Sequence, residues 1–287
     1  MIVKNAMQLK ALIKNKSVEK NIPAQLILQN YIMERFLERV AISKYKKNFI
    51  VKGGFLISAI LGIDNRTTMD LDTTLKGMPL SEENLRKTLT EICSIDIEDN
   101  FTFKLDKFSP IREDDEYQGW RAYLHANYEH MKTYLTVDIT TGDKITPRAI
   151  NYSFQLLFEK RSIILMSYTT ETILAEKIET ILSRSVANTR PRDFYDVYKI
   201  VSLYRDEIDF SVLHQALEKT AEKRNSLKLI KEYKVRLDDI QNSDQMKRFW
   251  NGYSKNNVYA NGISFDDVCN AVRDIMWELI EENMDKD

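Results

Sequence analysis

The sequence predicts an α+β protein built around a mixed β-sheet with helices packed against it. Residues 1–47 place apolar side chains at helical spacing, and residues from 169 onward do the same. Residues 48–168 instead contain short runs of Val, Ile, Thr and aromatic residues between turn residues, a pattern typical of strands. A chain of 287 residues is long enough for two lobes. We therefore expect a sheet core with N-terminal helices over 1–168 and a C-terminal helical domain over 169–287.

The first domain opens with a helix in "NIPAQLILQNYIMERFLERVAISKY", for which Asn21 is a suitable N-cap and Pro23 suits the first turn. Two more helices are expected between strands, "GFLISAILGI" and "SEENLRKTLTEICS", the second capped by Ser81. The expected strands are "NFIVKGG", "MDLDTTL", "FTFKLDKF", "GWRAYLHANY", "YLTVDITTG", "YSFQLLF" and "SIILMSY".

The second domain is expected to be a helical bundle. Its periodic segments are "TTETILAEKIETILSR", "RDFYDVYKIVSLY", "FSVLHQALEKTAEKR", "DQMKRFWNGYSK" and "SFDDVCNAVRDIMWELIEENM". No repeat or low-complexity linker separates it from the first domain, so we expect the two domains to share an interface.

Composition limits the classes of function. The net charge of -1 gives no broad basic field, so any contact with nucleic acid must be local. No apolar run approaches the roughly 18 to 20 residues that cross a bilayer, and the lysines of "MIVKNAMQLKALIKNK" do not suit a secretory signal. We expect a cytoplasmic protein. Cys93 and Cys269 lie far apart and match no metal-ligand spacing, which indicates ordinary thiols.

A diglycine, Gly53-Gly54, lies between an expected strand and an expected helix. Unsatisfied N–H groups and the helix dipole make such a turn suitable for a phosphate. A plain turn is the commoner explanation of such a pair, and the stretch is neither a P-loop nor a dinucleotide fingerprint.

Two aspartates, Asp70 and Asp72, follow in "MDLDT". Alternation along a strand places both carboxylates on one face, where a divalent cation would balance them. Solvation on an exposed face is the alternative. A third carboxylate, Asp138, stands between Val137 and Ile139, a context in which an unpaired aspartate is costly if buried. Three carboxylates beside a phosphate-binding turn are suited to two-metal phosphoryl or nucleotidyl transfer.

At these residues the sequence resembles the polymerase-β-type nucleotidyltransferase superfamily, in which a Gly-Gly or Gly-Ser turn precedes an Asp-x-Asp pair and a third acidic residue. Three segments, "RTTMDLD", "ETILAEKIETIL" and "RPRDFYDVYKI", are similar to motifs of the AbiEii family. That family comprises nucleotidyltransferase-like toxins of bacterial abortive-infection and toxin-antitoxin modules. The resemblance covers residues 20 to 205.

The resemblance implies a role for each matching residue, with Asp138 also expected to assist as a base. The nucleotide phosphates would contact Gly53, Gly54, Arg66, Lys177 and Arg192. The metal ions would be bound by Asp70, Asp72 and Asp138. Asp193 would position Lys177 or the acceptor, and Asp196 belongs to the same motif. Arg192 stands where relatives often carry lysine, which keeps the charge but changes the hydrogen-bond geometry.

The family also implies cofactors and partners. These are two Mg²⁺ ions, an NTP, an RNA acceptor such as a tRNA 3' end, and an antitoxin encoded nearby. We expect a monomer that inhibits growth in phage defence, with the domain of 169–287 closing the active-site cleft.

Physical interpretation leaves alternatives at two of these positions. Lys177 lies on the flank of an apolar helix stripe and could simply pair with Glu176 or Glu179. Asp193 lies in a first helical turn, where capping alone would explain a carboxylate.

Two other functions compete with nucleotidyl transfer. A metal-dependent nuclease or phosphatase could use the same carboxylates, but it has little use for Gly53-Gly54, Arg66 and Lys177 around a triphosphate. A catalytically silent nucleotide-binding module is the other alternative, and the presence of all three carboxylates argues against it.

Overall fold

The computed structural model describes residue 3 and residues 5–111 and 119–280. The chain divides into two compact units. The first comprises Met1–Asp143 and Ala149–Tyr168, and the second comprises Lys144–Arg148 and Thr169–Asp287. Each unit is described by itself below.

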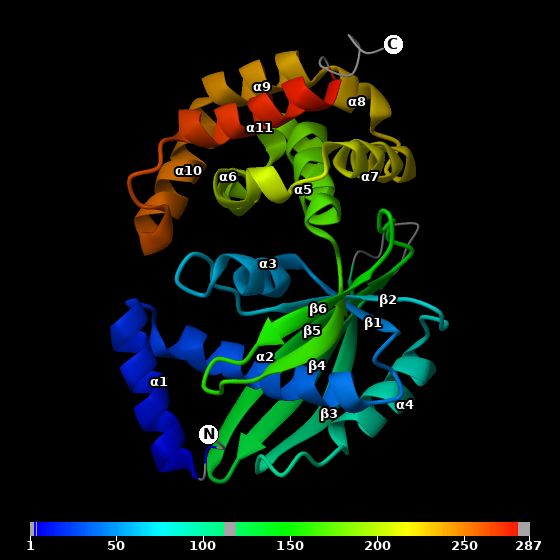
Figure 1. Cartoon of the computed structure of the whole chain (residues 1–287), viewed down its shortest axis with the longest axis vertical. Helices are drawn as coiled ribbons and strands as arrows, with labels where there is room; N and C mark the ends of the chain where they lie inside the picture. Colours follow the sequence, from blue (N-terminus) through cyan, green and yellow to red (C-terminus); the bar gives the residue numbers. More distant parts are fainter. Residues whose placement is uncertain (1–2, 4, 112–118, 281–287) are drawn as a thin grey trace. The chain divides into compact units, whose positions relative to one another are not determined.

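In its described residues, the first unit combines a sheet with four helices (Figure 1). The helices are α1 (Ala6–Lys20), α2 (Ala24–Ile42), α3 (Gly53–Leu61) and α4 (Glu82–Cys93). The strands are β1 (Phe49–Lys52), β2 (Leu71–Leu75), β3 (Phe101–Ile111), β4 (Gly119–Tyr128), β5 (Met131–Thr141), β6 (Ile150–Gln155) and β7 (Ser162–Ser167).

The second unit is helical. Its α-helices are α5 (Thr170–Arg184), α6 (Pro191–Tyr204), α7 (Phe210–Lys223), α8 (Leu227–Lys231), α9 (Tyr233–Asn242), α10 (Asp244–Asn256) and α11 (Phe265–Ile280). Short 3₁₀ turns follow α5, α6 and α10, at Ser185–Ala187, Arg205–Glu207 and Val258–Ala260. Among the described residues, none of the helices combines the length and apolar character needed to cross a membrane.

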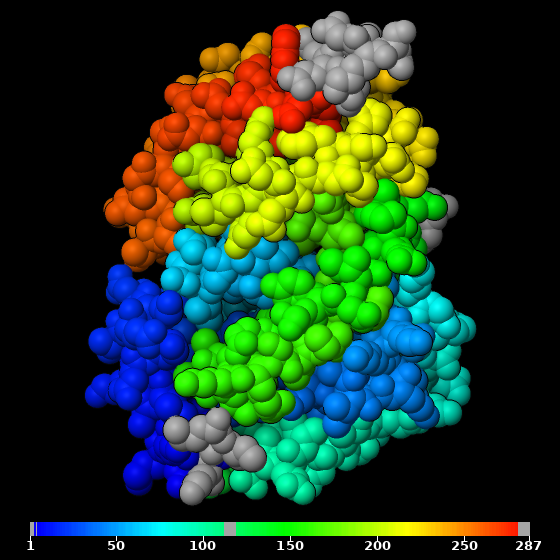
Figure 2. Space-filling view, viewed as in Figure 1, coloured from blue at the N-terminus to red at the C-terminus, as the bar shows by residue number. Residues whose placement is uncertain are grey.

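The seven strands form one mixed sheet in the order β3-β4-β5-β2-β1-β7-β6. The β1–β7 and β2–β5 pairs are parallel, and the remaining pairs are antiparallel. The hairpin of β6 and β7 forms one edge of the sheet and lies on the face of the molecule shown in Figure 2. Ile150 and Ile164 of this hairpin are exposed. The predicted α+β class is confirmed.

One face of the sheet is apolar because inward residues alternate with polar ones along each central strand. Leu71, Val137 and Leu124 are fully buried on this face. Helix α2 packs against it, with the Phe36 ring edge-on to Phe103 of β3 at a centroid distance of 5.8 Å, and α4 packs beside β3. The polar residues of the same strands therefore point to the opposite face.

Two local expectations are corrected. Asn21 does not cap α2; it ends α1 in the left-handed conformation, with φ 52°, which asparagine tolerates. The N-cap of α2 is Pro23. Asp70 lies directly before the first residue of β2 rather than inside the strand. The expected cap of α4 is confirmed, because the Ser81 hydroxyl accepts a hydrogen bond from the Asn84 N–H at 3.2 Å.

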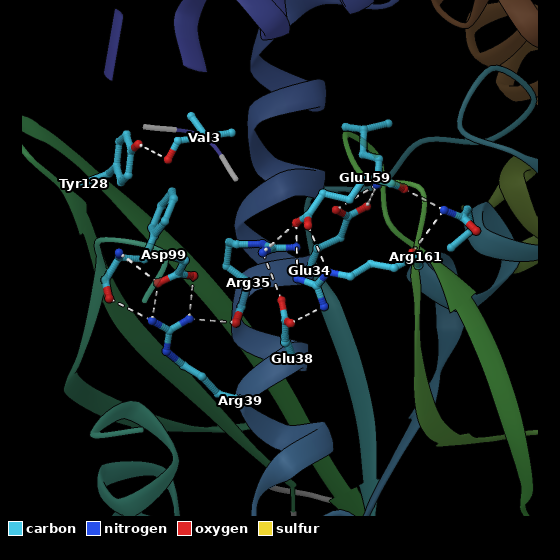
Figure 3. A network of polar contacts seen from close by, with 12 residues as sticks. Val3, Glu34, Arg35, Glu38, Arg39, Asp99, Tyr128, Glu159 and Arg161 are labelled. Carbon is cyan, nitrogen blue, oxygen red and sulfur yellow. Dashed lines mark hydrogen bonds and ion pairs between the residues drawn. The ribbon is translucent and has the colours of Figure 1, made fainter. Parts of the chain in front are cut away.

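Helix α2 carries an unusual set of buried charges (Figure 3). Arg39 makes a bidentate pair with Asp99, at 2.9 and 2.7 Å, and also donates to the Phe101 carbonyl at 2.8 Å. One turn closer to the start of the helix, Arg35 pairs with Glu38 at 2.9 Å and with Glu159 at 3.2 Å. Since α2 lies against the sheet, these pairs attach it to the segment before β3 and to the turn between β6 and β7.

Glu34 belongs to the same helix and is also buried. Its carboxylate accepts hydrogen bonds from the Leu157 N–H at 3.0 and 3.1 Å and from the Asn30 amide at 3.0 Å. Burial raises the pKa of Glu34 to about 8, although the Leu157 N–H and the charge of Arg35 oppose that shift.

The raised pKa predicts a pH-dependent stability. The folded chain holds the Glu34 proton more tightly than the unfolded chain, so this contribution is complete below the unfolded pKa of 4.5 and is lost as pH rises towards 8. Relative to Glu34→Gln, the wild type should lose about 3 kcal/mol of unfolding free energy between pH 5 and pH 8. Urea unfolding at both pH values measures this.

The matched control is Glu83→Gln, because Glu83 is exposed in the first turn of α4. Its difference from the wild type should change by no more than about 0.5 kcal/mol over the same range. Parallel pH curves for Glu34→Gln and the wild type would contradict the assignment.

Candidate active site

Four charged side chains lie in one row across the polar face of the sheet. Lys52 of β1 pairs in register with Asp72 of β2, Asp72 with Asp138 of β5, and Asp138 with Arg121 of β4. Paired residues in neighbouring strands point to the same face and lie about 5 Å apart. The row therefore reads cation, carboxylate, carboxylate, cation.

The outer cation on β4 is bonded to its neighbour. Arg121 donates from Nε to Asp138 Oδ1 and from Nη2 to Asp138 Oδ2, both at 2.7 Å. The hydrogen bond to Asp138 raises the pKa of Arg121 further above its usual range. The Arg121 side chain is 38% exposed and that of Asp138 16% exposed, so the pair borders solvent.

The cation at the other end of the row is held by a different carboxylate. Lys52 Nζ lies 2.5 Å from Asp143 and 2.8 Å from the Thr140 hydroxyl. Asp143 also accepts hydrogen bonds from Thr74 and from the Tyr168 hydroxyl. Burial alone would raise the pKa of Asp143, but Lys52 and these hydroxyl donors hold it well below its usual range.

The diglycine begins α3 beside the acidic pair. Gly53 has φ +64°, and a Cβ atom there would lie 2.1 Å from Asp72 Oδ2 and 2.8 Å from Asp72 Cβ. A Cβ at Gly54 would lie 2.9 Å from the Thr68 hydroxyl and 3.3 Å from Arg66 Nη2. Only glycine permits this close approach. The structure thus brings the turn, Arg66 and Asp72 together.

The charge state of Asp72 reflects its neighbours. Burial raises the pKa of Asp72, the negative charges of Asp138 and Asp70 raise it further, and Lys52 and the Gly54 N–H oppose the shift. Asp70 is thus within electrostatic reach of the row. A cation bound here would relieve the repulsion that these carboxylates exert on one another.

The carboxylates of the site suit a metal ion bound by two protein ligands better than one bound by three. Within the described residues, no group of three or more His, Cys, Asp or Glu side chains is arranged to hold a metal ion, so the expected three-carboxylate cluster stays a prediction. Mg²⁺ is commonly bound by one or two carboxylates and completed by water and substrate phosphates. Asp70 and Asp72 fit that arrangement, because among the described residues neither forms an ion pair.

The other predicted residues lie in the second unit. Lys177 Nζ of α5 lies 2.5 Å from Asp193 Oδ1 and 3.0 Å from Asp196 Oδ2 of α6. Both aspartates are buried, and the Lys177 side chain is 17% exposed. Arg192 is exposed in the first turn of α6. Lys177 is therefore joined to α6 in addition to any neighbour on its own helix.

Removing this ammonium should destabilise the chain. Lys177→Met leaves two buried carboxylates without it, which we expect to cost about 3 kcal/mol in urea unfolding. Adding Asp193→Asn should restore part of the loss. The matched control, Lys219→Met on an exposed position of α7, should change stability by less than about 0.5 kcal/mol. Equal losses for the two lysine variants would contradict this assignment.

Three residues of the site were not predicted from the sequence. Lys52 directly precedes the diglycine, and that adjacency was a usable signal. Arg121 lies in the alternating segment "GWRAYLHANY", but its partner depends on the register between β4 and β5. Asp143 follows β5, and nothing in the sequence links it to Lys52.

The fold resembles that of a solved structure from Helicobacter pylori. The structure of JHP933 from Helicobacter pylori matches with a TM-score of 0.50 and 16% identity, over 91% of this chain and 96% of that one. A second structure from H. pylori, described as a proposed nucleotidyltransferase, has a TM-score of 0.48 at 16% identity, over 91% and 97%. An antigenic nucleotidyltransferase-like protein from Paracoccidioides brasiliensis has a TM-score of 0.39 at 16% identity, over 67% and 88%.

A family model then identifies the protein more closely. Residues 35–271 match "Nucleotidyl transferase AbiEii toxin, Type IV TA system". The match spans most of the chain, so the chain belongs to the AbiEii family and is a nucleotidyltransferase of the type IV toxin class. Membership implies an NTP substrate and an antitoxin partner. Among the curated proteins, no match was found.

Proposed function

We propose that the chain is a growth-inhibiting toxin that transfers NMP from an NTP to a hydroxyl of an RNA, in the first instance the 3' end of a tRNA. The observation that carries this proposal is the close approach of Asp72 to the Gly53 turn, where a Cβ atom on Gly53 would lie 2.1 Å from Asp72 Oδ2. Family membership supplies the class of reaction. The acceptor, the metal and the role in phage defence are parts of the proposal.

Several residues of the proposed site would bind the phosphates of the nucleotide. The backbone of Gly53 and Gly54 at the N-terminus of α3 would hold the phosphates, with Arg66 beside Gly54. Lys177 would contact the triphosphate, and Arg192 would add charge from α6. Asp193 would hold the Lys177 ammonium in one orientation, as the 2.5 Å contact supports.

We propose that Asp70 and Asp72 bind Mg²⁺ and that a second ion enters with the triphosphate. Bound Mg²⁺ would favour ionisation of the acceptor hydroxyl and balance the charge that develops on the transferred phosphate. The acceptor hydroxyl would release its proton to solvent water, its oxygen would bond to the α-phosphorus, and the bond from the α-phosphorus to the α–β bridging oxygen would break, so that pyrophosphate leaves with the electron pair. The roles predicted for Asp138 in metal binding and proton removal are not carried into this proposal, because both its oxygens accept bonds from Arg121.

The test uses the full chain with each of four α-labelled NTPs, Mg²⁺ and total RNA, followed by size separation. Label on RNA of discrete size with at least one NTP is the expected result. Shortened RNA without label would favour a nuclease, and absence of both would favour a silent nucleotide-binding module. Label on protein would replace RNA by a protein hydroxyl as acceptor.

A further inference from the structure

The carboxylates of the site differ in what already neutralises them. Asp138 accepts two hydrogen bonds at 2.7 Å from the guanidinium of Arg121, one on each oxygen. Such a planar, bidentate pair is the strongest geometry an arginine can offer a carboxylate. Within the described residues, neither Asp70 nor Asp72 has a bidentate ion pair of this kind, although the charge of Lys52 acts on Asp72 and that of Arg121 interacts with Asp70.

The charges of the row and its neighbours can be paired one by one. Lys52 is held by Asp143, and Arg121 is held by Asp138. The carboxylates that remain are Asp70 and Asp72. Their two negative charges match one divalent cation, whereas a second cation between Asp72 and Asp138 would have to be bound beside a guanidinium.

We propose that Arg121 takes the place of a second cation beside Asp138, so that the nucleotide-free chain binds one divalent ion through Asp70 and Asp72. This inference rests on the metal site of the proposed function and goes beyond it, because it assigns a role to Arg121. Arg121 acts through Asp138 as a positioning residue. Its fixed charge keeps Asp138 from sharing an ion with Asp72.

The register supports this role over a purely structural pair. Arg121 and Asp138 are directly opposite in the β4–β5 ladder, and Asp138 is directly opposite Asp72 in the β2–β5 ladder. The guanidinium therefore approaches Asp138 from β4, the neighbour of β5 on the side away from Asp72. Its partial exposure leaves it within reach of solvent ions, so that removing it would open the position to a metal.

Binding of Mn²⁺ alone, counted per chain by electron paramagnetic resonance and isothermal titration, tests the inference without any nucleotide. The wild type should bind one ion. Arg121→Met should bind a second ion, with an affinity about tenfold or more above any second-site binding by the wild type. Arg121→Lys keeps the charge and should still bind one ion. Two equivalent ions on the wild type, or one ion on Arg121→Met, would overturn the inference while leaving the proposed transfer reaction intact.

Two further variants keep the test decisive if Arg121→Met does not fold. Asp138→Asn should retain the single ion within about threefold, whereas Asp72→Asn should lose about tenfold or more in affinity. Loss of the ion in Asp138→Asn would show that Asp138 is a ligand and would overturn the inference. A wild type that binds no Mn²⁺ would remove the metal assignment itself, and NTP labelling then reports separately on the reaction.

The matched control is Arg86→Met. Arg86 is exposed on α4 and pairs with Glu82 at 2.8 Å, so its removal also frees a carboxylate in the first unit. Its Mn²⁺ stoichiometry should equal that of the wild type. A second ion on this control would mean that any released carboxylate binds Mn²⁺, which would contradict a specific role for Arg121.

Discussion

Asp72→Asn should lower NTP-dependent labelling of RNA by about three orders of magnitude, equivalent to roughly 4 kcal/mol of transition-state stabilisation. The substitution keeps the size of the side chain and its position beside Gly53 but removes the charge proposed to hold Mg²⁺. Initial rates with the preferred NTP measure the effect. In cells, the same substitution should abolish growth arrest on overexpression.

Asp72→Asn should not lower the free energy of unfolding, although it lowers activity. The pKa of Asp72 is raised by burial and by Asp138 and Asp70, so the ionised carboxylate is disfavoured in the folded chain. At neutral pH, Asp72→Asn should therefore be as stable as the wild type or more stable by about 1 kcal/mol. A loss of activity that merely followed unfolding would contradict the assignment.

Asp106→Asn is the control for this experiment. Asp106 lies in β3 of the same sheet, is exposed and is 3.7 Å from His125. Its rate should stay within about twofold of the wild type, because it lies outside the row of charges. Undiminished labelling in Asp72→Asn, or an equal loss in Asp106→Asn, would remove Asp72 from the site.

Gly53→Ala should destabilise the first unit by about 2 to 3 kcal/mol and lower activity with it. The new methyl group would lie 2.1 Å from Asp72 Oδ2, and rotation of that side chain cannot relieve the approach, because Asp72 Cβ is only 2.8 Å away. The φ of +64° adds strain for any residue other than glycine. Urea unfolding and the labelling assay together measure the effect.

Gly252→Ala is the matched control. Gly252 lies in α10, and a Cβ there would meet nothing within 4 Å. Alanine in a helix should leave stability unchanged or raise it by about 0.5 to 1 kcal/mol. If the two glycine variants behave alike, the close approach of Gly53 to Asp72 does not exist in solution.

Local patterns predicted much of the fold. Alternation identified the strands, and the Ser81 cap was found because its geometry involves only four successive residues. Asn21 was misassigned because asparagine suits either end of a helix, and only the chain around it shows that α1 stops there.

The acidic residues of the site could be named in advance, because their spacing and their neighbours can be read from the sequence alone. Not all of their partners could be named. The resemblance pointed to Asp193 as a residue that positions Lys177, and the structure pairs Lys177 with Asp193 and also with Asp196 of another helix. Arg121, in contrast, was not named, because it reaches Asp138 only through one register of β4 and β5.

The assignment of Lys144–Arg148 to the second unit has a practical consequence. The backbone passes from one unit to the other three times, after residues 143, 148 and 168. A truncated polypeptide ending at 168 would strip Thr146 of its bonds with Thr169 and Thr172. An N-terminal fragment made by truncation would therefore keep the segment Lys144–Arg148 without the unit to which it belongs. Point substitutions are better suited than truncation to studying each unit of this toxin.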